Sequence, residues 1–127
     1  MHSLAYEPHP THLKATLRGS PTANEFLDAL QQVGFESARG EFDLVLLDLR
    51  EVVPVYSFTD QLRMGQEVAR CMTHLRKLAS VVPADRITRV SEKSAKHAGA
   101  TVRIFTVESQ ALEWLLEGQG ATAVAPA

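Results

Sequence analysis

Ser57 is the residue whose type and position best suit regulatory chemistry. It stands directly before an amphipathic segment, and a hydroxyl at a helix N-terminus lies where backbone N–H groups and the helix dipole favour a phosphate. Asp60 follows three residues later, so the pair also fits a variant of the capping box, in which the serine only caps the helix. The helix cap is the simpler interpretation, and a regulated serine is the alternative.

Asp48 is the second candidate. It lies near the C-terminal end of Asp43 to Leu49, the most strand-like segment of the chain. Open α/β sheets bind ligands beyond the carboxyl ends of their strands, so Asp48 could contact a partner or act as a general base. More often, an acid at this place binds the N–H groups of a neighbouring loop. No second carboxylate or histidine accompanies it at a recognisable spacing, so acid–base chemistry has little support.

A basic stripe follows one side of a predicted helix further along the chain. Its members recur at intervals of three or four residues: Arg86, Arg89, Lys93 and Lys96. Such a stripe could meet anionic headgroups, RNA or an acidic partner, although a solvated helix face is the ordinary explanation. No aromatic residues are interleaved to stack bases, and the net charge of −2 gives no general attraction to nucleic acid. We therefore expect no nucleic-acid partner.

The remaining reactive residue types form no recognisable catalytic or metal-binding pattern. His9 and His12 are close in sequence but lack a third ligand, and no glycine-rich phosphate loop, nucleophile elbow or zinc-protease motif is present. The single cysteine, Cys71, is expected to be buried and unreactive, and it indicates a reducing compartment. We expect no enzyme, no metal and no cofactor.

The elements that must position these residues alternate between strands and helices. Apolar alternation predicts an opening hairpin, and Thr22 with Glu25, or Ser20 with Pro21, predicts a helix start that leads to a stop at Gly34. The later elements are a strand at 43–49, a helix at 57–75, a strand at 77–82, a helix at 85–97, a strand at 101–106 and a helix at 108–116. This order predicts one mostly parallel five-stranded sheet with an N-terminal antiparallel hairpin and about four helices.

Length and composition fit a single domain. A chain of 127 residues with 45% hydrophobic residues can bury one core, which we place in residues 1–117. Residues 118–127 (GQGATAVAPA) are expected to be a disordered tail. No apolar run reaches the roughly 20 residues of a membrane span, and no signal sequence is evident, so a cytoplasmic location is expected.

Three segments in this order resemble the SpoIIAA-like family, which is related to STAS anti-sigma-factor antagonists and to CRAL-TRIO lipid carriers. They are Leu47-Asp48-Leu49 at a strand end, the closing VRIFT at 102–106 and ALEWL at 111–115. The resemblance extends from about Leu13 to Leu116. It implies the fold, a regulatory or ligand-binding role and a tendency to self-associate.

The resemblance also implies binding or switch residues. In STAS antagonists an LDL strand end is followed by an Asp-Ser-Ser-Gly helix start, whose first serine a partner kinase phosphorylates. Laid on this chain from Asp48, that serine falls at Ser57, with Tyr56, Phe58 and Thr59 at the positions of the aspartate, the second serine and the glycine. Asp48, Tyr56, Ser57 and Thr59 are thus the candidate switch residues.

The sequence therefore predicts a non-enzymatic regulatory module that binds a protein partner. The alternative is a carrier or sensor of a small apolar ligand, in a pocket whose wall would be formed by Tyr56, Phe58, Met64 and Met72. We also expect a homodimer, from the resemblance and because Val53, Val55 and Leu116 are apolar residues that one core does not readily absorb.

Overall fold

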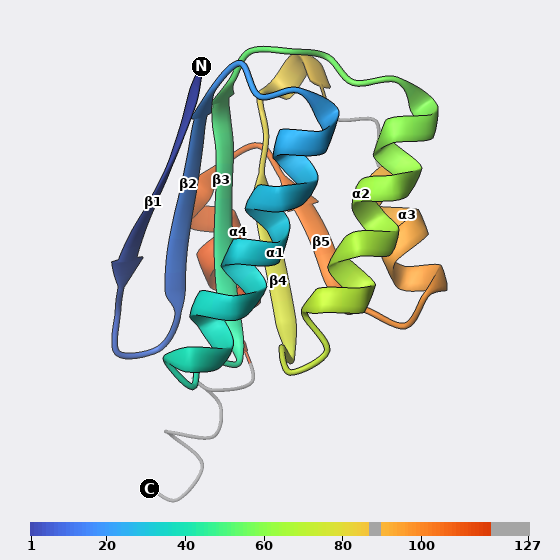
Figure 1. Ribbon diagram of the computed structural model, residues 1–127. Coiled ribbons are helices and arrows are strands. Elements are labelled where there is room, and N and C mark those ends of the chain that lie inside the picture. The colour runs from blue at the N-terminus through green and yellow to red at the C-terminus, as the bar shows by residue number, and fades with distance from the viewer. Residues whose placement is uncertain (87–89, 118–127) are drawn as a thin grey trace, which may run out of the picture.

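The computed structural model describes residues 1–86 and 90–117, which form one sheet with helices on both of its faces (Figure 1). The strands are β1 (His2–Pro8), β2 (Leu13–Gly19), β3 (Leu44–Val52), β4 (Lys77–Val81) and β5 (Val102–Phe105), and they lie side by side in chain order. β1 runs antiparallel to β2, and the other neighbours are parallel. The N-terminal hairpin is as predicted, but the sheet is mixed rather than mostly parallel.

The helices cover the two faces of the sheet unequally. They are α1 (Ala23–Arg39), α2 (Phe58–Cys71), α3 (Val90–His97) and α4 (Glu108–Leu115), with a 3-10 turn at Ala84–Arg86. α1 and α2 lie on one face, α3 packs beside α2, and α4 lies on the opposite face (Figure 1). No helix in the described ranges is both long enough and apolar enough to cross a membrane. The predicted tail, 118–127, lies outside the described residues.

Helix α1 begins at the capping box that the sequence predicts. The Thr22 hydroxyl accepts the Glu25 N–H at 3.1 Å, and the Glu25 carboxylate accepts the Thr22 N–H at 2.9 Å. The predicted stop at Gly34 is wrong, because the helix continues to Arg39. A Cβ added at Gly34 would lie 2.5 Å from the carbonyl oxygen of Cys71. This glycine therefore lets α1 and α2 approach closely and does not end the helix.

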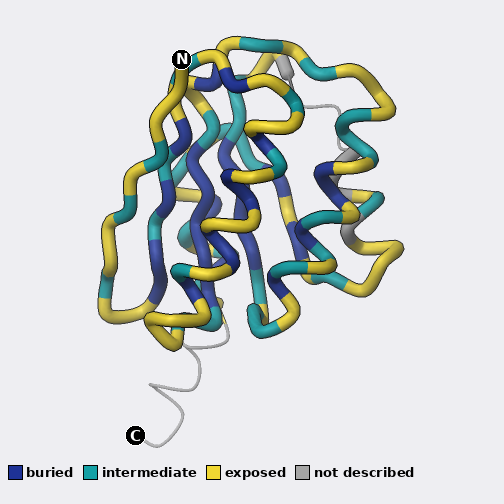
Figure 2. Tube along the Cα trace, viewed as in Figure 1, coloured by how far each residue is buried: buried dark blue, intermediate teal, exposed yellow. Residues whose placement is uncertain are grey.

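Two apolar clusters lie on the two faces of the sheet, as the nearly continuous apolar run of β3 predicts. Val45 and Leu47 join the larger cluster under α1 and α2, while Leu44 and Leu46 join the smaller cluster under α4. Figure 2 shows the buried residues concentrated along the central strands. β3 is longer than predicted and runs to Val52, and α2 ends at Cys71 rather than at Leu75.

The α4 face of the sheet is only partly covered. α4 packs on β3, β4 and β5, so the same face of β1 and β2 carries polar side chains instead of a helix. On β2 these are Lys14, Thr16 and Arg18, which alternate with the buried Leu13, Ala15 and Leu17 of the α1 face. This bare half of the sheet ends at β1, whose outer edge pairs with no strand of the described chain.

Candidate functional site

Ser57 caps helix α2. Its backbone is extended, with φ −65° and ψ 162°, and its hydroxyl accepts the N–H of Asp60 at 3.1 Å. The residue is exposed, so the hydroxyl both closes the first turn and faces solvent. The capping role that the sequence predicts is thus confirmed, and the serine is still accessible to another molecule.

Tyr56 fixes the loop that precedes the helix. Its hydroxyl donates to the carbonyl of Pro21 at 2.8 Å, and its ring meets the Phe26 ring edge-on with centroids 5.2 Å apart. The Gln61 side-chain amide donates to the Tyr56 carbonyl at 2.9 Å. Tyr56 therefore anchors the loop to the start of α1, and its side chain packs against the larger core cluster.

Three large apolar side chains within five residues of Ser57 in the sequence are exposed to solvent. Val53, Val55 and Phe58 are 61%, 75% and 64% exposed, although the loop between them is held in place. Thr59 is exposed beside them on the first turn of α2. We call the set Val53, Val55, Ser57, Phe58 and Thr59 the β3–α2 surface. The carrier hypothesis expected Phe58 in the wall of an apolar pocket, but Phe58 is the first residue of α2 and its side chain is exposed.

Asp48 does not belong to this surface. It lies in the middle of β3 rather than at its end, and it faces α4, whereas its neighbour Leu47 and Tyr56 pack with the core under α1 and α2. The family resemblance grouped Asp48 with Ser57 among the candidate switch residues, but the structure separates the two. The extra residues of β3 carry the loop away from Asp48.

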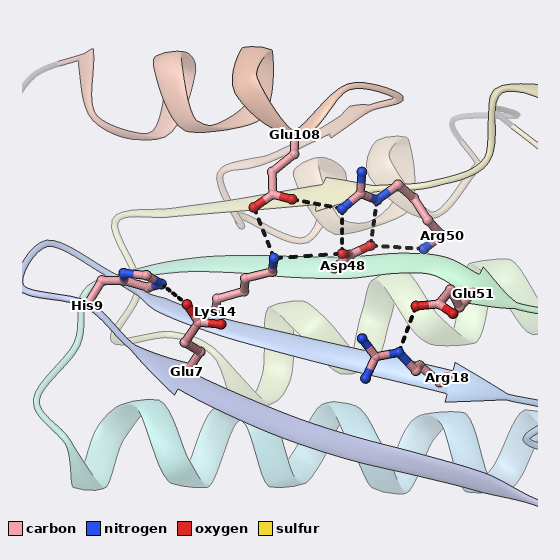
Figure 3. A network of polar contacts seen from close by, with 8 residues as sticks. All are labelled: Glu7, His9, Lys14, Arg18, Asp48, Arg50, Glu51 and Glu108. Carbon is pink, nitrogen blue, oxygen red and sulfur yellow. Dashed lines mark hydrogen bonds and ion pairs between the residues drawn. The ribbon is translucent and has the colours of Figure 1, made fainter.

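Asp48 instead lies within an alternating ring of charges (Figure 3). Arg50 donates to both carboxylate oxygens, at 3.0 and 2.8 Å, and to Glu108 of α4 at 2.7 Å. Lys14 donates to Glu108 at 3.0 Å and lies 4.0 Å from Asp48. The ring connects β2, β3 and the first turn of α4. The sequence analysis missed Lys14, Arg50 and Glu108, which are far apart along the chain.

The electrostatics of this ring argue against a general base. Burial of the Asp48 side chain by itself raises its pKa, but the hydrogen bonds and charge of Arg50 outweigh burial and hold the pKa below its usual value. The same contacts raise the pKa of Arg50. A general base needs a pKa near the working pH, and Asp48 is moved away from it. The geometry fits a structural clamp between the sheet and α4.

The basic stripe is only partly within the described chain. Lys93 and Lys96 are exposed on α3, Arg86 ends the 3-10 turn, and Arg89 lies outside the described residues. The helix is attached to α2 by the Ser94 hydroxyl, which donates to the Leu62 carbonyl at 3.0 Å. The structure therefore does not unite the four basic residues into one described patch.

The space between helices and sheet is small. An apolar cavity of about 60 Å³ lies there, lined in part by Phe26, Leu47, Met64 and Val68. Ligand pockets for drug-sized molecules measure about 300–1,000 Å³. Of the four wall residues that the carrier hypothesis named, only Met64 lines the cavity; Met72 is core, Tyr56 anchors the loop and Phe58 is exposed.

Reactive side chains elsewhere in the described ranges do not gather into a further site. His9 and His12 stack with ring centroids 4.6 Å apart, but the described residues contain no group of three or more His, Cys, Asp or Glu placed to hold a metal. Cys71 is half-buried at the end of α2, and burial raises the pKa of its thiol to about 11. A thiol with this pKa is a poor nucleophile at neutral pH.

Comparisons with known proteins identify the fold. No family model and no curated protein matches the chain. An anti-sigma factor antagonist from Mycobacterium paratuberculosis is similar in structure, with a TM-score of 0.64 and 14% identity over 91% of this chain and 94% of that chain. A DUF3478-family protein with a SpoIIAA-like fold from Shewanella loihica gives a TM-score of 0.55 and 16% identity over 90% and 93% of the two chains. The chain thus has the SpoIIAA-like fold that the sequence resemblance predicted.

Proposed function

We propose that this protein is a non-enzymatic regulatory module that binds a protein partner through the β3–α2 surface. One observation carries the proposal: residues 53–58 expose three large apolar side chains and an accessible serine, on a segment that Tyr56 and Gln61 hold in place. Contiguous exposed apolar groups on a soluble domain are typical of interaction sites. A loop that is already ordered loses little entropy when a partner binds.

The fold supports the same role. One structural neighbour is an anti-sigma factor antagonist, a protein named for acting on another protein. The resemblance to STAS antagonists aligns their regulated serine with Ser57, and the exposure of this serine supports a role in the contact. A carrier function receives no comparable support, since the interior cavity measures only about 60 Å³.

Site-specific photocrosslinking tests the proposal directly. A photoreactive amino acid replaces Val55, and the full chain is expressed in its own kind of cell and irradiated. We expect one discrete crosslinked protein, identified by mass spectrometry. The matched control places the same group at Val107, directly before α4, which is 44% exposed and lies outside the β3–α2 surface. No crosslink at Val55, or the same products from both positions, would contradict the proposal.

Charge at Ser57 provides the second prediction. Ser57→Asp should retain the stability of the fold, because aspartate caps helices about as well as serine and its charge suits a helix N-terminus. The same charge lies among Val53, Val55 and Phe58, so binding of the crosslinked partner should weaken at least tenfold, or about 1.4 kcal/mol. Affinity is measured by titration calorimetry and stability by urea unfolding. Unchanged affinity would remove Ser57 from the contact.

A further inference from the structure

A different surface, the outer edge of β1, is open for strand pairing. β1 is the terminal strand of the sheet, and the structure contains no described element that pairs with its outer side. Natural proteins protect such edges with charged side chains, lysine above all, with proline, bulges, inward-pointing charges or very short strands. β1 has seven residues, HSLAYEP, with no lysine and no bulge; its charged residue Glu7 and its proline Pro8 stand at the C-terminal end, which leaves residues 2–6 without such protection.

Two backbone hydrogen bonds establish which groups of β1 face outward. The Ser20 N–H donates to Met1 O, and the His9 N–H donates to His12 O, both at 2.9 Å. These pairs continue the register of β1 with β2, so Met1 and His9 point their main-chain groups toward β2. The N–H and C=O groups of successive residues point alternately to the two edges of a strand. The main-chain groups of the even-numbered residues between Met1 and His9 therefore point away from β2.

The outward set consists of His2, Leu4, Tyr6 and Pro8. Pro8 is consistent with this phase, because its missing N–H would otherwise break a bond with β2. The free edge therefore offers three N–H donors, at His2, Leu4 and Tyr6, and the carbonyls of all four residues. Their side chains and those of the intervening residues decide what can pair there.

We propose that the occupant of this edge is β1 of a second copy, paired antiparallel about a two-fold axis at Ala5. This register is the one in which all seven residues overlap. It opposes Leu4 with Tyr6 of the partner subunit, Ser3 with Glu7 of the partner subunit, and His2 with Pro8 of the partner subunit. No like charges meet, a serine hydroxyl faces a carboxylate, and the small Ala5 lies at the close central pair. Each copy donates its three outward N–H groups to the other.

The surroundings of the edge fit this dimer. Between β1 and α1 runs a groove of about 480 Å³, whose lining includes Tyr6 and Phe35 and the acidic Asp28 and Glu36. The Tyr6 hydroxyl is buried without a hydrogen-bond partner among the described residues, and Phe35 is 66% exposed. When the two-fold axis is perpendicular to the sheet, helix α1 of both copies lies on the same side of the joined sheet. The two grooves then adjoin, and a second copy covers the exposed Phe35 ring of each.

The proposed interface differs from the one that the sequence suggested. Val53 and Val55 lie on the β3–α2 surface, and Leu116 is partly buried against the smaller core cluster, so these residues do not form one patch. In Figure 1 β1 and α2 lie at opposite sides of the molecule. A β1 dimer therefore leaves the β3–α2 surface of each copy open.

Cysteine crosslinking tests the register. In Ala5→Cys the two new thiols lie across the central pair, where Cα atoms of a non-hydrogen-bonded pair are about 4.5 Å apart and a disulfide fits. Mild diamide oxidation of the full chain should produce a disulfide-linked dimer. Ser3→Cys, on the same strand and face, should not crosslink, because its copies lie about 13 Å apart along the strands. Wild type, which retains Cys71, controls for that thiol.

Charge substitutions at Ser3 test the same register without a covalent bond. Ser3→Lys opposes Glu7 of the partner subunit and should lower the dimer dissociation constant, whereas Ser3→Glu should raise it, each by about two- to thirtyfold for two pairs. Sedimentation equilibrium measures both. A monomer at every concentration, or a dimer that Ala5→Cys does not crosslink, would overturn the proposal. Val55→Asp with Phe58→Asp should leave the dimer intact, which separates this result from the proposed function.

Discussion

At the scale of single residues, Asp48 shows how a candidate catalytic acid can serve the fold instead. Asp48 is 7% exposed, and its carboxylate accepts hydrogen bonds from both the backbone N–H and the guanidinium of Arg50, which also donates to Glu108. A buried anion with these partners is stable as an anion, and it is unsuited to taking up a proton during a reaction. The ring also connects the N-terminus of α4 to the sheet.

The lowered pKa of Asp48 makes a signed prediction about stability. Because the folded state binds the proton less readily than the unfolded state, the ring stabilises the protein above pH 3.8, the usual pKa, and this contribution is lost as the pH falls through the folded pKa. Asp48→Asn should reduce the free energy of unfolding by about 1–3 kcal/mol at pH 7. The difference from wild type should shrink below pH 3.8. Urea unfolding across pH measures it.

The matched control is Glu51→Gln, on the same strand as Asp48. This substitution removes an exposed ion pair with Arg18 of β2. Exposed pairs contribute about 0–1 kcal/mol, so this variant should change stability little at any pH. Equal losses in the two variants, or a loss in Asp48→Asn that does not depend on pH, would contradict the structural role assigned to the ring.

Local sequence patterns predicted the N-caps of α1 and α2, but they could not predict contacts between residues that are far apart in the sequence. Thr22 with Glu25 and Ser57 with Asp60 are separated by three residues, so their spacing alone indicates a helix start. Lys14 and Glu108 are 94 residues apart and meet only because β2 and α4 face the same side of the sheet. No spacing rule applies to such a pair, and the ring around Asp48 was therefore missed.

At the scale of elements, the contact between α1 and α2 depends on Gly34. Gly34→Ala would place a Cβ 2.5 Å from the Cys71 carbonyl oxygen, a backbone atom that cannot rotate away. We expect a loss of about 1–3 kcal/mol in the free energy of unfolding, although alanine has the higher helix propensity. Gln31→Ala, on the exposed side of the same helix, is the control and should be nearly neutral. A more stable Gly34→Ala would contradict this packing.

Element boundaries explain most of the errors in the sequence prediction. Gly34 looks like a helix stop because glycine often follows a last turn, but here it serves a helix crossing. Arg50 and Glu51 look like the end of a strand because they are charged, yet they continue β3, where Arg50 binds Asp48 and Glu108 and Glu51 pairs with Arg18 of β2. The order of strands and helices was still readable, because the central apolar segments alternate so clearly.

At the scale of the whole molecule, dimer formation predicts a stability that depends on protein concentration. A dimer that forms only from folded copies stabilises the native state by mass action. The melting temperature of wild type should therefore rise with protein concentration. In Ala5→Glu, which sets two carboxylates opposite each other at the two-fold axis, it should not. Differential scanning calorimetry over a dilution series measures both. Parallel curves for the two proteins would count against the dimer.

The order of the strands has a consequence for how the chain folds. β1 to β5 lie across the sheet in the order in which they are synthesised, and each strand pairs with its neighbours along the chain. During translation every new strand can add to the free side of a sheet that already exists, with no need to insert between strands already paired. The side that receives no later strand is β1. From the moment β2 has paired with it, that first edge is available to another nascent or finished chain.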